Sequence, residues 1–447
     1  MCFCDVQSTL IYVTLQVLRR VIGFFDFLKQ FMNNTNNDAF AAMRYSEFRQ
    51  YITSRFLLTI ALQMQNVLLG WRIYELSNDP LALGVVGLAE AIPAISVALY
   101  AGHVVDQSDK RNSYLWVCGL FALFVGLFGL ATARHIETLI NHSAIIWGIY
   151  GLIFLWGIVR GFSMPAGFSL MASLIPKSES ANAASWSTTS WQIGAIIGPA
   201  LGGGVYAWYG VEAAFGVALV LTLVAVVNIY FVSPKPPKPV EVKETLTASI
   251  TKGLQFVFNS PIILGALSLD LFSVLFGGVT ALLPIFANDI LKAGPQGLGI
   301  LRAAPSVGAA LMLIWLTYYP PLRHTGYKLL GAVAMFGVTT ILFAWSVNFY
   351  WSVLLLALGG AFDAVSVQIR HTILQLTIPD DMRGRVSSVN MIFISSSNEI
   401  GAFESGAAAR LMGLIPSVVF GGCMTLLVVA GTYIKAPTLR KFSMKKY

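Results

Sequence analysis

Charged side chains are scarce in this chain. Only 11% of its 447 residues are Asp, Glu, Lys or Arg, whereas 56% are hydrophobic. Soluble domains carry about 25% charged residues, and a single soluble core rarely grows past about 250–300 residues. A water-soluble globular protein is therefore excluded, and lipid is the solvent that the composition predicts. The 40 glycines and 18 prolines fit this environment, because packed membrane helices tolerate both residues.

Cysteine and histidine are also rare. Two of the four cysteines, Cys2 and Cys4, lie near the N-terminus, and Cys118 and Cys423 lie in apolar runs, so no disulfide framework is expected. The five histidines are scattered, and neither His-Glu-x-x-His nor the phosphate-binding Gly-x-x-x-x-Gly-Lys occurs. We therefore expect no catalytic residues, no metal, no cofactor and no ATP-driven reaction.

Twelve apolar runs are long enough to cross a bilayer, which takes about 20 residues per helix. They lie at 54–76, 81–103, 113–133, 143–166, 183–208, 213–232, 262–288, 297–318, 327–346, 350–373, 386–410 and 416–434. Lys and Arg concentrate in the segments that stay inside if the N-terminus is inside. This bias predicts a multi-pass protein of the cell (inner) membrane with both termini cytoplasmic, and it explains the net charge of +8 without nucleic acid.

The polar breaks between these runs divide the chain into parts. We expect a six-helix half over 43–232, a cytoplasmic linker over 233–260, a second six-helix half over 261–435 and a basic cytoplasmic tail over 436–447. The linker opens with Ser-Pro-Lys-Pro-Pro-Lys-Pro and continues as a short surface helix over 244–258. Residues 1–42 are either an interfacial helix or an extension created by a mis-assigned start, with Met43 as the first residue.

Two pairs of short motifs suggest that the halves are related. Pro80 and Pro295 each open a span with the spacing Pro-x-x-Leu-Gly. Ser-Trp-Gln-Ile-Gly at 190–194 is similar to Ser-Asn-Glu-Ile-Gly at 397–401, in the equivalent span of the other half. Both matches fall where a duplicated transporter would place them.

A charged motif follows the second span. Its sequence is Gly102-His-Val-Val-Asp106-Gln-Ser-Asp109-Lys110-Arg111. It resembles the Gly-x-x-x-Asp-x-x-x-Arg/Lys-Arg/Lys signature of the major facilitator superfamily. The resemblance implies an all-α integral membrane fold of twelve transmembrane helices in two six-helix halves. Gly102, Asp106, Lys110 and Arg111 would form a latch that breaks when the halves rock, although an ordinary charged turn is the alternative.

The fifth span carries a second motif, Gly194-Ala-Ile-Ile-Gly198-Pro199-Ala-Leu-Gly202-Gly203. It is similar to the Gly-x-x-x-Gly-Pro-x-x-Gly-Gly motif of the superfamily's exporters and antiporters. Small residues at this spacing make a flat face for close packing, and proline bends the helix. We expect this bent seam to pack against the eighth span and to seal one side of a cavity.

Further stretches resemble the enterobactin and macrolide exporter branch of the superfamily. They are Gly70-Trp-Arg-Ile-Tyr-Glu-Leu76 with Asp79-Pro80, Leu282-Leu-Pro-Ile-Phe286 and Pro379-Asp-Asp-Met-Arg-Gly-Arg-Val386. The loop 319–328, where a second copy of the latch would lie, has no acidic residue.

Ionisable residues inside the spans mark functional positions by default, because charge in lipid is costly. The deeper candidates for proton coupling are Glu399, Asp363, Asp270, Glu90 and Arg160. A carboxyl group whose surroundings alternate between water and a basic partner can bind and release a proton in each cycle. Glu399 is the first choice, because its repeat equivalent, Gln192, cannot titrate. Arg160 resembles the fourth-span arginine of the family's proton-linked members.

Other charges near the span ends are expected to form structural salt bridges. Arg302, Arg370 and Glu404 belong to this group. Asp363 and Arg370 are seven residues apart, so they share a helix face and are expected to join one network.

The ionisable residues inside the spans predict proton coupling, and the resemblance to the superfamily's exporters implies an antiporter that exports small amphiphilic molecules such as siderophores or drugs. It would work as a monomer in a lipid bilayer by alternating access between the halves. An importer or facilitator of a small nutrient is the alternative within transport. A membrane-embedded enzyme or scaffold without transport is the alternative from another class.

Overall fold

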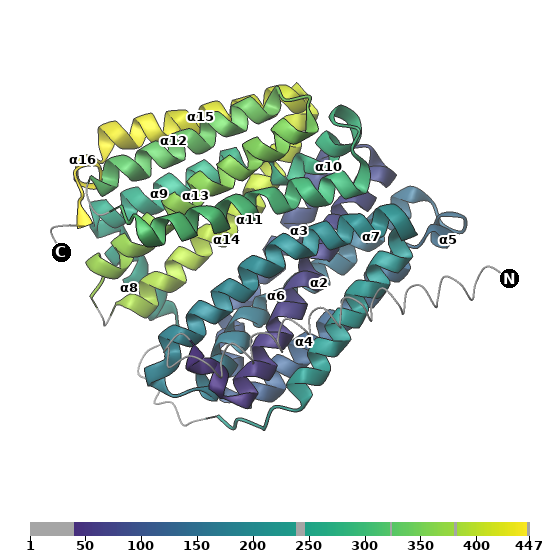
Figure 1. The fold of residues 1–447 in the computed structure, drawn as a ribbon, viewed down its shortest axis with the longest axis horizontal. Coiled ribbons are helices and arrows are strands. Elements are labelled where there is room, and N and C mark those ends of the chain that lie inside the picture. The colour runs from purple at the N-terminus through teal and green to yellow at the C-terminus, as the bar shows by residue number, and fades with distance from the viewer. Residues whose placement is uncertain (1–39, 238–245, 322–323, 380–381, 445–447) are drawn as a thin grey trace.

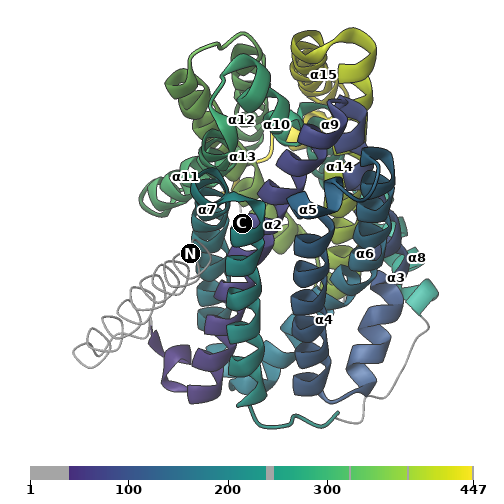
Figure 2. The same ribbon diagram turned by 90° about the vertical axis from the view of Figure 1, so that its right-hand side faces the viewer.

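The computed structural model of the protein describes residues 40–237, 246–321, 324–379 and 382–444, and within them the chain is helical and contains no strand. Figure 1 shows two bundles side by side, one purple to teal and the other green to yellow. Figure 2 shows the same bundles at right angles to this view. The predicted extension over 1–42 lies almost wholly outside the described residues.

The N-terminal half consists of five long helices, and its last helix contains two predicted spans. The helices are α2 (Ser46–Ser77), α3 (Pro80–Gln107), α4 (Lys110–Ala131), α6 (His142–Leu174) and α7 (Ser180–Tyr230), with short turns at η2 (Ala42–Arg44), α5 (Arg134–Glu137) and η3 (Lys177–Glu179). Gly210 turns the chain inside α7 with φ of 84°, a conformation that favours glycine.

The C-terminal half repeats this plan with more interruptions. Its elements are α9 (Pro261–Gly277), η4 (Val279–Leu282), α10 (Leu283–Ile285), the π-helical turn η5 (Phe286–Ile290), α11 (Gly294–Tyr318), α12 (Thr325–Ala344), α13 (Phe349–Thr377), α14 (Arg383–Met412), α15 (Leu414–Lys435) and α16 (Pro437–Arg440). The connecting helix α8 (Leu246–Asn259) lies where a surface helix was predicted.

The twelve predicted crossings agree with this architecture. Ten helices among the described residues are long and apolar enough to span a membrane, and one of them is the two-span α7. The predicted eleventh span corresponds to α14, which is not among the ten because Ser, Asn and Glu interrupt its apolar sequence. The fold class predicted from the sequence is confirmed.

Local sequence explains where several of these helices begin. The Asp79 side chain accepts a hydrogen bond from the Leu81 amide at 2.9 Å, and Pro80 follows it as the first residue of α3. Asp109 caps α4 in the same way through the amide of Asn112. Such caps satisfy amides that have no partner within the helix, so these junctions end one span and start the next.

The glycine face of α7 packs mainly on α2. A Cβ at Gly194, Gly198 or Gly202 would lie 2.6–3.0 Å from atoms of α2. The predicted contact with α11 is made instead by the other side of the motif. There a Cβ at Gly203 would lie 2.4 Å from the Pro295 carbonyl oxygen. Residues spaced by four share one face, so Gly203, one residue on from Gly202, points toward a different neighbour.

The predicted linker and tail both contact the C-terminal half. In α8, Val257 is fully buried, and a Cβ at Gly253 would lie 2.8 Å from the Arg385 carbonyl oxygen. In the tail, the Phe442 carbonyl accepts a hydrogen bond from the Gly326 amide, and Leu439 is fully buried. The described parts of these segments are therefore packed elements.

Candidate functional site

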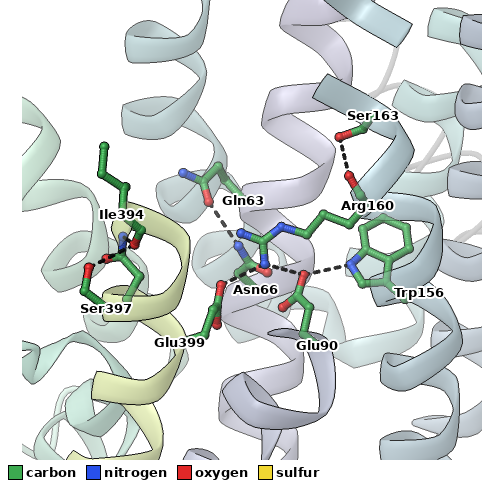
Figure 3. A network of polar contacts seen from close by, with 10 residues as sticks. Gln63, Asn66, Glu90, Trp156, Arg160, Ser163, Ile394, Ser397 and Glu399 are labelled. Carbon is green, nitrogen blue, oxygen red and sulfur yellow. Dashed lines mark hydrogen bonds and ion pairs between the residues drawn. The ribbon is translucent and has the colours of Figure 1, made fainter. Parts of the chain in front are cut away.

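Three ionisable side chains meet between the two halves. Arg160 Nη1 on α6 lies 2.8 Å from Glu90 Oε1 on α3 and 2.8 Å from Glu399 Oε1 on α14. Trp156 Nε1 also donates to Glu90 Oε1, at 3.1 Å. Figure 3 shows the two carboxylates on either side of the guanidinium. Because Glu399 belongs to the C-terminal half, this ion triad (Glu90, Arg160 and Glu399) links the halves through charge-assisted hydrogen bonds.

Glycines on both sides of α3 place the triad. A Cβ at Gly157 would lie 2.4 Å from the Glu90 carbonyl oxygen, and one at Gly161 would lie 2.9 Å from that of Ala94. On the other side, a Cβ at Gly87 would lie 3.1 Å from the Glu399 carbonyl oxygen. Only small residues allow helices to approach this closely. Sequence reasoning missed these positions, although the Gly-x-x-x-Gly spacing around Arg160 was a readable signal.

A cavity of about 210 Å³ adjoins the triad. It lies between the halves and combines apolar walls with a few polar groups, which is typical of small-molecule sites. The lining residues include the triad, Gln65, Asn66, Gly70, Leu83, Val86, Ile153, Trp156, Thr280 and Arg302. The structure thus brings three of the five coupling candidates together at one cavity.

Arg302 differs from its predicted role, and Asp363 lies apart from the ion triad. Arg302 lines the central cavity and forms no ion pair within the described part of the chain, so its predicted salt bridge is not found. Asp363 lines a separate cavity of about 180 Å³ inside the C-terminal half, together with Thr339 and Asn398. It has no hydrogen-bond or ion-pair partner among residues 40–237, 246–321, 324–379 and 382–444.

Asp270 and Arg370 form a buried ion pair between α9 and α13. Their side chains are 10% and 4% exposed, and neither residue is among those that line the central cavity. The predicted network of Asp363 with Arg370 is therefore wrong. Seven residues along a helix span about 10 Å, and the Arg370 side chain turns to α9, where Asp270 is its partner.

Among the described residues, those of the predicted latch contact their own half or the start of the linker. Asp106 Oδ1 lies 3.9 Å from Lys110 Nζ, which donates to the carbonyls of Val105 and Asp106. Arg111 donates to the Tyr230 carbonyl at 2.6 Å. Gly102 has open space where a Cβ would be. In this structure, the motif makes no described contact across the halves.

The opposite end of the bundle holds contacts between the halves. We call it the sealed end and define it by the junctions at 77–80 and 290–294. Asp79 Oδ2 lies 3.2 Å from Arg410 Nη1, and the Tyr74 hydroxyl donates to Asp289. A Cβ at Gly299 would lie 2.4 Å from the Pro199 carbonyl oxygen. Deeper in the bundle, Gln192 Nε2 donates to the Ser306 carbonyl at 2.7 Å.

Two helical bundles that enclose a cavity between them and contact each other at one end are the architecture of a membrane transporter. Residues 51–437 match the family model of the Major Facilitator Superfamily, and the chain belongs to this family. It is a multi-pass membrane transporter of a small-molecule substrate and not an enzyme.

Curated relatives are similar along most of their length. The Enterobactin exporter EntS of Escherichia coli O81 (strain ED1a) is 23% identical over 401 residues, which cover 88% of this chain and 93% of that protein. The Enterobactin exporter EntS of Citrobacter koseri is 24% identical with the same coverage. These relatives agree with the branch that the sequence motifs resembled.

Solved transporters share the fold. The POT family transporter PepTSo aligns with a TM-score of 0.67 at 14% identity, covering 88% of this chain and 98% of that one. A bacterial homologue of the iron transporter ferroportin in an inward-facing state aligns with a TM-score of 0.66 at 15% identity, covering 89% and 99%. At these identities the likeness concerns the fold alone.

Proposed function

We propose that this protein is a proton-coupled antiporter that exports small amphiphilic molecules such as siderophores or drugs. It would act as a monomer in the cell (inner) membrane, with both termini cytoplasmic, as the distribution of Lys and Arg suggests. The observation that carries the proposal is the ion triad, because a titratable group of one half is bonded to a cation of the other. The curated relatives support export and the siderophore class.

The triad suggests how a proton and a substrate could be exchanged. With both carboxylates ionised, Arg160 holds Glu399 and thereby locks the halves together. Protonation removes the charge of Glu399 and weakens this bond, while Glu90 still neutralises Arg160. A substrate that donates a hydrogen bond to Glu399 would also release Glu399 from Arg160. Either ligand frees the halves, and the empty, unprotonated carrier stays locked, which is what obligatory exchange requires.

The two sequence motifs take roles at opposite ends in this scheme. Gly203 and Pro199 of α7 would form the seal with α11 in the present state. The Asp106 latch would engage when the halves close at its own end, since it makes no described contact across the halves in this state. Rocking of one bundle against the other would exchange the two closures.

Reconstitution in proteoliposomes tests the proposal. A substrate is first selected from siderophores, macrolides and lipophilic cations by protection of an efflux-deficient host. Transporter molecules inserted with their cytoplasmic face outward should accumulate the substrate in the lumen when the lumen is acidic. An ionophore that collapses the pH gradient should stop this accumulation. Uptake that ignores the ionophore would indicate a facilitator, and accumulation driven by an alkaline lumen would indicate symport.

A further inference from the structure

Arg302 lines the central cavity and has no ion-pair partner among the described residues. It lies on α11 of the C-terminal half, and its side chain reaches across to α2 of the other half. A Cβ at Gly70 would lie 3.1 Å from Arg302 Nη2. Its Nε is buried and has no hydrogen-bond acceptor. No described residue forms an ion pair with it, and Glu90 and Glu399, the acids that line this cavity, are bonded to Arg160.

An unpaired guanidinium inside a membrane protein is costly, because it loses hydration without gaining an anion. Nearby structure does not explain its presence, since a neutral side chain would fill the same place at lower cost. A guanidinium offers five donors in a planar fork that matches a carboxylate. An anionic group that entered the cavity and left it in each cycle would supply the missing charge.

We propose that Arg302 binds an anionic group of the transported substrate, and that the substrates are amphiphilic acids that are ionised at neutral pH. This inference rests on the proposed transport function and names the substrate class of its cavity. Leu69, Leu83, Val86 and Ile153 line the same cavity and offer contacts for an apolar ring. The acid group lies at Arg302 while the ring lies against this apolar wall.

Such a substrate also fits exchange against a proton. The cavity holds two carboxylates, Glu90 and Glu399, which accept hydrogen bonds in their ionised form. A substrate with a hydroxyl or amide donor beside its acid group binds Arg302 and Glu399 at once. The donor then competes with the proton for Glu399. Amphiphilic acids that carry a hydrogen-bond donor are therefore the favoured substrates.

Matched pairs of acids and amides test the anion site directly. Binding of salicylate, 1-naphthoate and indole-3-acetate to the purified full chain in detergent is compared with binding of their amides, by calorimetry at pH 7.5. We expect at least one acid to bind about tenfold or more tightly than its amide, the range of a charge-assisted hydrogen-bond pair. Arg302→Gln should bring this ratio close to one, and Arg302→Lys should retain part of it.

Thermal unfolding without ligand separates a binding role from a structural one. If Arg302 serves the substrate, Arg302→Gln should leave the midpoint unchanged or raise it, because no described bond is lost. Arg134→Gln, which removes an exposed arginine outside the cavity, should keep both the midpoint and the acid preference. Equal binding of acids and amides by the unmodified protein, or a full acid preference in Arg302→Gln, would overturn the proposal. Neither result depends on a pH gradient, so the binding test can fail while antiport succeeds.

Discussion

The protein contains two internal ionic clusters of similar chemistry in different surroundings. In the C-terminal half, Asp270 and Arg370 come from α9 and α13 of the same bundle and are almost fully buried. Between the halves, the side chain of Arg160 is 46% exposed and is shared by Glu90 and Glu399. A buried pair within one bundle has no route to exchange its proton or its partner. The cluster that adjoins the cavity can be reached by a proton and by a substrate, so we expect coupling at the ion triad rather than at the buried pair.

The largest expected effect is on coupling. We predict that Glu399→Gln abolishes pH-driven substrate accumulation in proteoliposomes, since Gln cannot bind the proton whose movement would drive it. Substrate binding should remain detectable, because Gln keeps the shape of the side chain. Asp363→Asn provides a matched control, since it removes an acid from the other cavity. Retained accumulation in Glu399→Gln with loss in Asp363→Asn would move the coupling site into the C-terminal half.

The buried pair should respond in stability instead. We expect Asp270→Asn to lower the free energy of unfolding by about 3–5 kcal/mol, because it leaves Arg370 as a buried charge without a counterion. The double variant Asp270→Asn with Arg370→Met should recover much of this loss. Chemical unfolding in detergent, followed by tryptophan fluorescence, measures both. Coupling per folded molecule should be unchanged; a selective loss of pH dependence would place Asp270 in the proton pathway.

The glycine contacts allow a sharper comparison along the seam between the halves. Gly299→Ala would place a Cβ 2.4 Å from the Pro199 carbonyl oxygen, whereas Gly204→Ala would meet nothing within 4 Å. Overpacking costs about 1–3 kcal/mol, so Gly299→Ala should shift the population away from the sealed state by about tenfold or more. Thiol labelling of a cysteine introduced at Ser77 reports the opening. Equal labelling of both variants would argue against a seal at this seam.

The smallest effect is expected at the predicted latch. Asp106 is largely exposed and lies 3.9 Å from Lys110, so its loss should cost the present state less than about 1 kcal/mol. In the proposed scheme the latch forms only in the other state, after the halves have rocked. Asp106→Asn should therefore destabilise that other state more and shift the equilibrium modestly toward the present one. Labelling of single cysteines on each face measures the shift. Unchanged accessibility on both faces would support the alternative of an ordinary charged turn.

Sequence patterns identified the ionisable residues of this site, but they did not predict which of these side chains contact each other. Long apolar runs specify crossings directly, and ionisable residues within them are few, so Glu90, Arg160 and Glu399 could each be singled out. Which side chains meet depends on the rotation and neighbours of each helix, which hydropathy does not encode. For this reason the structural salt bridge expected for Arg370 is found, but its partner is Asp270 and not Asp363. Arg302 was assigned to a salt bridge but lines the cavity.

The repeat carried more information than its weak similarity suggested. Gln192 and Glu399 occupy equivalent positions, and each reaches a helix of the opposite half, Gln192 through the Ser306 carbonyl and Glu399 through Arg160. One link is neutral and the other can titrate. This asymmetry, visible in the sequence, is the feature on which pH control is proposed to depend.

The most direct test of this account measures the separation of the halves as a function of pH, without substrate. Spin labels at Ser77 and Lys292, in a variant without native cysteines, report opening of the sealed end by pulsed electron paramagnetic resonance. The account predicts one short distance at alkaline pH, a second, longer distance on acidification, and both distances at every pH in Glu399→Gln. A pH-dependent shift in Glu399→Gln equal to that of the unmodified protein would contradict the proposed lock.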